Sequence, residues 1–155
     1  MEKRVTFEEQ IEKEGILFYT LVGKSMMPLL RERRDVIQVE KIMSPLKKFD
    51  VVLFRRENRR LGRDDYVLHR ILRLNPDGTY WIVGDNCFSG DTVKQEEIIG
   101  LLTAVIRDGK KVSFDGFGYR LYLFFFCRLW RIRIALLHLR SLFSRFRRKL
   151  FGKKS

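Results

Sequence analysis

Cysteine, histidine and proline are all scarce in this chain of 155 residues, which contains two, two and three of them. Cys87 and Cys127 are too few and too far apart for a disulfide framework, and no Cys/His spacing indicates a structural zinc site. We therefore expect no metal and no cofactor. The low cysteine content also favours a reduced compartment.

Long apolar runs are missing as well. The longest run, residues 121–127, ends at Arg128 and is far shorter than the roughly 18 residues of a membrane-spanning helix. Residues 1–14 are charged throughout and lack the apolar centre of a signal peptide. The sequence thus predicts neither a signal peptide nor a transmembrane helix.

Acidic residues are absent from Gly118 onward, where eleven Lys and Arg side chains account for most of the net charge of +13. The first 117 residues therefore carry a net charge of only +2. A basic tail of this kind points to an anionic surface, either membrane lipid or nucleic acid.

Residues 1–117 have the pattern of a mostly β domain. Thr6 and Glu9 have the spacing of a capping box, which predicts a short N-terminal helix ending at Gly15. Runs rich in β-branched and aromatic residues predict strands at 16–22, 36–39, 51–54, 66–72, 80–83 and 98–106. Turn residues at 75–78 and 108–109 predict hairpins. The polar, basic stretch 55–65 is expected to be an exposed loop.

The pattern changes to a helical one after about residue 117. Apolar residues from Tyr122 to Leu150 recur at alternating steps of three and four, while arginines occupy the other positions. This predicts a second region, residues 118–155, formed by a long basic amphipathic C-terminal helix. The domain boundary is expected between residues 117 and 118.

Three short segments contain residues that could carry out chemistry. Ser25 lies between Gly23 and Pro28, in a turn that would expose its hydroxyl, although an isolated serine there is usually only a turn residue. His69 shares a strand face with apolar neighbours, where histidine is more often structural than catalytic. Asp85 and Asp91 lie in a glycine-containing loop that by itself would also indicate structure.

Taken together, the three segments resemble the signal peptidase I superfamily of serine peptidases, which also includes self-cleaving repressors. Ser25-Met26-Met27-Pro28 matches the box that holds the nucleophile. His69-Arg70 matches the pair that the eukaryotic and archaeal type has where bacterial enzymes use lysine. Gly84-Asp85-Asn86 matches a third box, and Asp91 stands at the spacing of the triad acid. The resemblance covers residues 15–112.

The resemblance implies a signal-peptidase-like β domain that cleaves a peptide, leader or precursor protein by a Ser-His-Asp mechanism. Ser25 would be the nucleophile, His69 the general base and Asp91 the acid that orients the imidazole. Met26, Pro28, Asp85 and Asn86 would support the site, although Asp85 remains an alternative triad acid. Backbone amides at Ser25 and in a neighbouring turn would stabilise the oxyanion.

Two features depart from the family pattern. In the family, glycines usually precede the aspartates that follow the first and second strands. Here these glycines are replaced, giving Arg34-Asp35 and Phe49-Asp50. We also expect no counterpart of the N-terminal membrane anchor of ordinary signal peptidases, so the substrates need not be secretory precursors.

The tail and the function each leave alternatives open. Apolar burial together with attraction of the arginines to anionic lipid would make residues 118–151 a membrane-docking helix and the protein a peripheral membrane protein of the cytoplasmic face. The helix could instead pack on the domain or form a coiled coil. Nucleic acid is disfavoured as a partner, because a self-cleaving DNA-binding regulator would need more than 15 residues before its first strand. A non-catalytic peptide-binding module of the same fold is a third possibility.

Overall fold

The computed structural model describes residues 6–58, 63–114 and 116–129, together with residues 132, 135 and 139. The chain divides into two compact units, residues 1–115 and 116–155. Each unit is described separately below.

Helix α1 (Phe7–Glu14) opens the first unit, as the capping box predicts. The Thr6 hydroxyl accepts a hydrogen bond from the Glu9 amide at 3.2 Å, and the Thr6 amide donates to the Glu9 carboxylate at 3.0 Å. Gly15 ends the helix with φ 74°, a left-handed conformation that glycine adopts without a Cβ clash. Ile11 is buried, which attaches the helix to the sheet.

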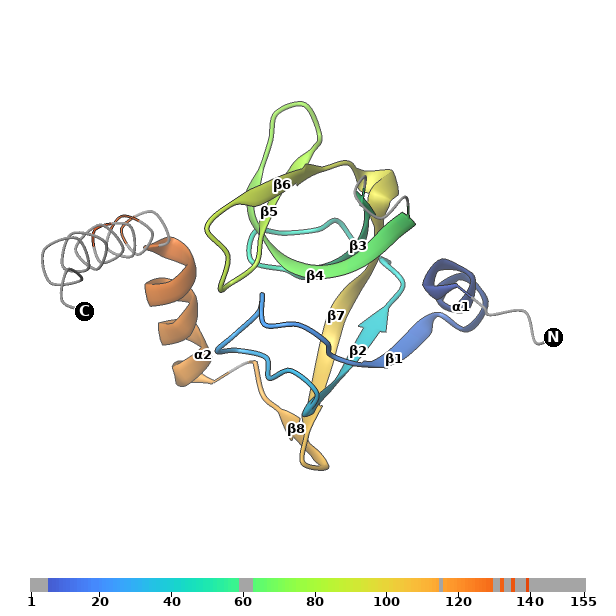
Figure 1. The fold of residues 1–155 in the computed structure, drawn as a ribbon, viewed down its shortest axis with the longest axis horizontal. Coiled ribbons are helices and arrows are strands. Elements are labelled where there is room, and N and C mark those ends of the chain that lie inside the picture. The colour runs from blue at the N-terminus through green and yellow to red at the C-terminus, as the bar shows by residue number, and fades with distance from the viewer. Residues whose placement is uncertain are drawn as a thin grey trace, which may run out of the picture. The chain divides into compact units, whose positions relative to one another are not determined.

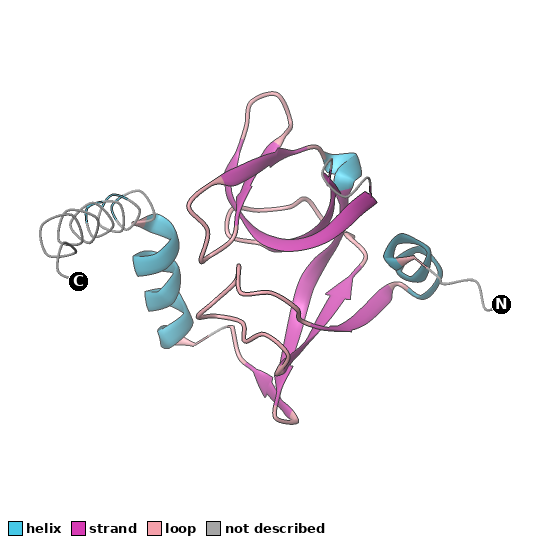
Figure 2. Cartoon of the chain, in the orientation of Figure 1, coloured by secondary structure: helices cyan, strands magenta, loops and turns pink. Residues whose placement is uncertain are grey.

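Eight antiparallel strands form the body of this unit, so the prediction of a mostly β domain is confirmed (Figures 1 and 2). They are β1 (Ile16–Thr20), β2 (Asp35–Glu40), β3 (Val51–Asn58), β4 (Arg63–Leu74), β5 (Tyr80–Val83), β6 (Gly90–Val93), β7 (Ile98–Arg107) and β8 (Lys110–Val112). The sheet has the order β1-β2-β7-β3-β4-β5-β6, and β8 pairs with β7. A short 3-10 helix, η1 (Gln95–Glu97), lies between β6 and β7.

The core consists of two clusters on opposite sides of β3. The first cluster contains Val51 and Leu53 of β3, and the second contains Val52 and Phe54. Because successive side chains of a strand point to opposite faces, both faces of β3 are covered. This explains the uninterrupted apolar run at residues 51–54.

Two parts of the sheet differ from the sequence prediction. The stretch 55–65 is not simply a loop, because β3 continues to Asn58 and β4 already begins at Arg63. Ladder pairs join Arg56 to Asp65 and Glu57 to Asp64, and backbone pairing sustains the strands despite their polar side chains. Strands β6 and β8 are not predicted, because Gly90-Asp91 and Lys110-Lys111 begin them and such residues are rare in strands.

In the second unit, α2 (Phe117–Tyr122) leads into a π-helix, η2 (Leu123–Arg128). A π-helix has more residues per turn than an α-helix, so the predicted stepping of three and four does not continue unchanged through η2. Most of the predicted long amphipathic helix lies outside the described residues. Within the described part of the chain, no helix is long and apolar enough to cross a membrane.

Candidate functional site

Ser25 lies in the long loop between β1 and β2, visible in Figure 2 as the loop that follows the first strand. Met26 and Leu30 anchor this loop, since both side chains are buried in the first cluster. Pro28 is exposed, and the peptide bond between Met27 and Pro28 is cis. Ser25 itself is partly exposed.

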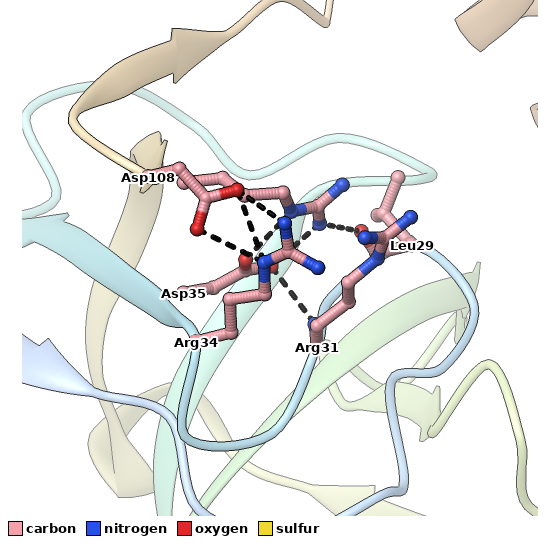
Figure 3. Close-up of polar contacts among 6 residues, drawn as sticks. Leu29, Arg31, Arg34, Asp35 and Asp108 are labelled. Atoms are coloured by element: carbon pink, nitrogen blue, oxygen red, sulfur yellow. Dashed lines mark hydrogen bonds and ion pairs between the residues drawn. The ribbon is translucent and has the colours of Figure 1, made fainter.

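A buried ion pair fixes the end of the same loop (Figure 3). Asp35 is fully buried, and its carboxylate accepts hydrogen bonds from Arg107 at 2.7 and 2.6 Å and from the Arg31 amide at 2.8 Å. Arg107 also donates to the Leu29 carbonyl at 2.8 Å. These bonds connect the serine loop to β7 and restrict its movement.

Arg34 stands where the family pattern has glycine and forms an exposed ion pair with Asp108 (Figure 3). Its backbone is not left-handed, whereas the preceding Arg33 has φ 57°. Phe49, at the second altered position, has φ 78°, a conformation that favours glycine. The aspartate that follows, Asp50, accepts a hydrogen bond from the Lys47 amide at 2.7 Å and so closes this turn.

His69 and Arg70 are adjacent in β4 and both are buried. The Arg70 guanidinium donates two hydrogen bonds to Asp85, at 2.9 and 2.8 Å, and one to the Phe49 carbonyl at 2.8 Å. The ion pair fixes the start of the loop 84–89 against β4. Asp85 thus has a structural role in the site, because both of its carboxylate oxygens accept hydrogen bonds from Arg70. Asp91, which the sequence places in this loop, instead lies in strand β6, because Gly90–Val93 pair with β5.

Gly84 lies between the serine loop and His69, and its lack of a side chain allows the two to approach each other. A Cβ atom at Gly84 would lie 2.8 Å from His69 Nε2 and 2.8 Å from the Ser25 carbonyl oxygen. Those two atoms are therefore no more than about twice that distance apart. The Cβ would also meet Cys87 Sγ at 2.6 Å, so no side chain fits here without displacing its surroundings.

Asn86 holds the serine segment from the other side. Its backbone amide donates to the Ser25 carbonyl at 2.7 Å, and its side-chain amide donates to the Lys24 carbonyl at 3.2 Å. These two bonds fix the peptide groups on both sides of Ser25.

The His69 imidazole is neutral at physiological pH. Burial lowers its pKa from 6.5 to about 4, Asp91 acts in the opposite direction, and Arg56 lowers it further. Its Nε2 atom lies 4.0 Å from Cys87 Sγ, while Nδ1 is buried and has no hydrogen-bond partner among the described residues. A neutral imidazole close to a serine is the form that can accept a proton.

Asp91 is not hydrogen-bonded to His69 among the described residues. Its carboxylate is 3.5 Å from the Arg56 guanidinium, and both side chains are partly exposed. No hydrogen bond joins Ser25 to His69, or His69 to Asp91, among the residues that the structure describes. The three triad candidates therefore lie in one region without forming a hydrogen-bonded chain.

A groove of about 620 Å³ runs past these residues. Its lining includes Ser25, His69 and Cys87, with Ile37 and Leu53 among its apolar residues. One wall comes from β1 and the start of the serine loop, and the other from residues 64–69 of β4.

Both walls of the groove have unpaired strand edges. β1 pairs only with β2, and β4 pairs with β5 only from Arg70 onward, among the strands described here. The backbone groups of Gly15 and Leu21 bond toward β2. By alternation those of Phe18 and Thr20 face the open edge.

Two residues at the site do not follow from the sequence patterns. Arg56 falls in the stretch that the sequence predicts to be a loop. Cys87 directly follows the Gly84-Asp85-Asn86 box, and that adjacency was the available signal. Burial raises the pKa of the Cys87 thiol, which therefore remains protonated at neutral pH.

No three His, Cys, Asp or Glu side chains gather as a metal site would require, within the described ranges. Comparison of the chain with protein-family models and with curated proteins found no match. The resemblance to signal peptidases consequently depends on the sequence motifs alone.

Proposed function

We propose that the protein is a serine endopeptidase similar to signal peptidase I, with Ser25 as nucleophile, His69 as general base and Asp91 as the acid. The observation that supports this most is the meeting of the Ser25 backbone and His69 Nε2 across Gly84, beside an open groove. Residues 44 positions apart in the chain are brought together where a peptide could reach both.

In the proposed reaction, His69 Nε2 accepts the hydroxyl proton of Ser25 as the oxygen attacks a peptide carbonyl carbon. The tetrahedral intermediate then collapses, and His69 gives the proton to the departing amine. Water hydrolyses the resulting acyl ester by the same route. Catalytic hydrogen bonds are often long or unformed without substrate, which fits the absence of a Ser25–His69 hydrogen bond here.

The two open strand edges support a peptide as the substrate. An extended segment lying between β1 and β4 could form main-chain hydrogen bonds with Phe18 and Thr20 of β1. The apolar groove residues Leu21 and Leu53 would contact alternate side chains of that segment. Such binding would present one peptide bond to Ser25.

The first prediction is that Ser25→Ala and His69→Ala each lower cleavage by about 10⁴-fold or more, because both residues take part in the same proton transfer. Cleavage of a random-sequence peptide library would be followed by mass spectrometry. Exposed Ser44 and the second histidine provide matched controls, Ser44→Ala and His138→Ala, which should cleave like the wild type.

Circular dichroism would show that the inactive variants are folded. A variant that cleaves at the wild-type rate would remove its residue from the mechanism. If the wild type binds peptides without cleaving any, the protein is a peptide-binding module instead.

We also propose that the second unit attaches the enzyme to anionic membranes. Phe117, Phe124, Phe125, Ile132 and Leu139 are all about half exposed or more. Eleven cationic residues and no acid accompany them from residue 118 onward. Exposed aromatic side chains together with this charge complement a lipid surface, in which apolar burial and electrostatic attraction add.

A further inference from the structure

Arg56, His69 and Asp91 come from three strands and share one side of the sheet. His69 is the ladder partner of Val52, and Arg56 follows Val52 at four residues on the same face of β3. In β6, Asp91 shares its face with Val93, which is buried in the second cluster beside Val52. The three side chains thus converge at the rim of the second cluster.

Arg56 contacts both the groove and Asp91, the proposed triad acid. It lines the groove together with Ser25 and His69. Its guanidinium is also the group that lies 3.5 Å from the Asp91 carboxylate. Meanwhile His69 Nδ1, the nitrogen that a triad acid would bind, is buried and has no hydrogen-bond partner in the part of the chain that the structure describes.

We propose that Arg56 is a carboxylate-binding subsite for the substrate, and that its occupation releases Asp91 to accept a hydrogen bond from His69 Nδ1. The proposal depends on the peptidase function proposed above and specifies its substrates as peptides with an acidic group in the groove. Cleavage of such peptides would be coupled to completion of the triad.

A substrate carboxylate can replace Asp91 at Arg56, because the ion pair between Arg56 and Asp91 is weak. Both partners are partly exposed, and pairs of this kind contribute little. A substrate carboxylate could bind the planar guanidinium through two hydrogen bonds, which is stronger than the single contact to Asp91. Binding of a substrate carboxylate is therefore more favourable for the Arg56 guanidinium than its contact with Asp91.

Other titratable groups near His69 cannot take the same role. Asp85 is held by two hydrogen bonds from Arg70, and Cys87 lies on the Nε2 side of the ring. Arg56 and Asp91 influence the His69 pKa in opposite directions, so they are the pair whose separation would alter the imidazole.

The kinetic test compares capped alanine-rich peptides that carry one Glu at successive positions with the same peptides carrying Gln. Wild type should cleave the best Glu peptide about tenfold or more faster, in kcat/KM, than its Gln counterpart. Arg56→Gln should lose the preference, and Arg56→Lys should retain part of it. The neighbouring Arg55, on the opposite face of β3, gives the control Arg55→Gln, which should keep the full preference.

Peptides with a free or an amidated C-terminus identify the source of the carboxylate. A preference for Glu that persists in amidated peptides assigns the subsite to an acidic side chain. A preference that follows only the free terminus assigns it to a terminal carboxylate. Equal cleavage of all these peptides by wild type and Arg56→Gln would overturn the proposal while leaving the peptidase function intact.

A second readout does not depend on cleavage. The chain has only two histidines, so the imidazole NMR signals of His69 can be assigned with His138→Ala. Arg56→Gln should raise the His69 pKa from about 4, because Arg56 lowers it, whereas Arg55→Gln should leave it unchanged. In the non-cleaving Ser25→Ala background, the Glu peptide should raise the His69 pKa and the Gln peptide should not.

These two readouts separate the hypotheses. If the wild type cleaves nothing but the Glu peptide still shifts His69, the subsite stands and the peptidase function fails. If the His69 pKa changes with neither peptide nor with Arg56→Gln, Arg56 does not control Asp91 and the proposed subsite is excluded.

Discussion

Two carboxylates six residues apart have different surroundings in this site. Asp85 is buried and bound to Arg70, which also binds the Phe49 carbonyl. Asp91 is partly exposed and contacts Arg56. Removal of either negative charge should therefore affect a different property of the protein.

Asp85→Asn should lower the free energy of unfolding by about 3–5 kcal/mol, because it leaves the buried Arg70 guanidinium without its anion. Asp91→Asn should change that free energy by less than about 0.5 kcal/mol, as expected for an exposed site, yet lower kcat/KM by about 10²–10⁴-fold. Urea unfolding and peptide cleavage measure the two effects. An Asp91→Asn enzyme with full activity would exclude Asp91 as the triad acid.

The sequence motifs locate the candidate residues but not their partners. The boxes at Ser25, His69 and Gly84 predict the residues that meet around Gly84. They cannot show that Arg70 binds Asp85 or that Arg56 binds Asp91, because those pairings depend on which strands lie side by side. Spacing along the chain contains no information about partners from other strands.

At the scale of secondary-structure elements, apolar strands and turns with special backbone angles are predictable. The hairpin turns illustrate this, since Asp108 and Gly109 both have positive φ and Gly78 has φ 80°. The polar ends of β3 and β4 are not predictable from composition, because they are strands through backbone pairing alone. Arg56 therefore looks like a loop residue in the sequence.

The Asp35–Arg107 ion pair joins the serine loop to β7 and should make the fold sensitive to acid. Burial by itself would raise the Asp35 pKa, but the hydrogen bonds from Arg107 and Arg31 outweigh it and lower the pKa below 3.8. A carboxyl group with a lowered pKa in the folded state stabilises the fold at neutral pH. That contribution is lost as the pH falls below about 3.8.

Asp35→Asn should lower the free energy of unfolding by about 3–5 kcal/mol at pH 7 and by progressively less below about pH 3.8, because the contribution of the ionised carboxylate to the wild type is lost there. Urea unfolding at several pH values gives the difference. Asp108→Asn removes an exposed carboxylate from the same group of residues and should have little effect. Equal sensitivity of the two variants would show that the Asp35 pair is not what holds the loop.

For the whole molecule, the distribution of charge is the prominent feature. The first 117 residues are nearly neutral, while the remainder is strongly basic and includes large exposed apolar side chains. Composition alone predicts this asymmetry. The geometry of residues 117–128 does not follow from it, because the π-helix η2 interrupts the regular stepping of the sequence there.

Binding of the full chain to anionic vesicles should weaken severalfold as salt rises from about 0.05 to 0.5 M without vanishing, because salt screens the arginines but leaves apolar burial. Vesicle flotation measures this, with phosphatidylcholine vesicles as the neutral control. Truncation after Gly118 should abolish binding while retaining cleavage of a short peptide. Binding to DNA with a steep dependence on salt, in place of vesicles, would favour the regulator.

The open edges of β1 and β4 restrict when a target chain could be cleaved. A groove that binds main-chain amides and carbonyls can be used only by a segment whose own backbone is unpaired, since helices and sheets have already committed those groups. A target with the right side chains would then be ignored once folded and cut only while its chain is still nascent, translocating or frayed. The proposed peptidase would thus discriminate first by the conformational history of its target and only afterwards by sequence.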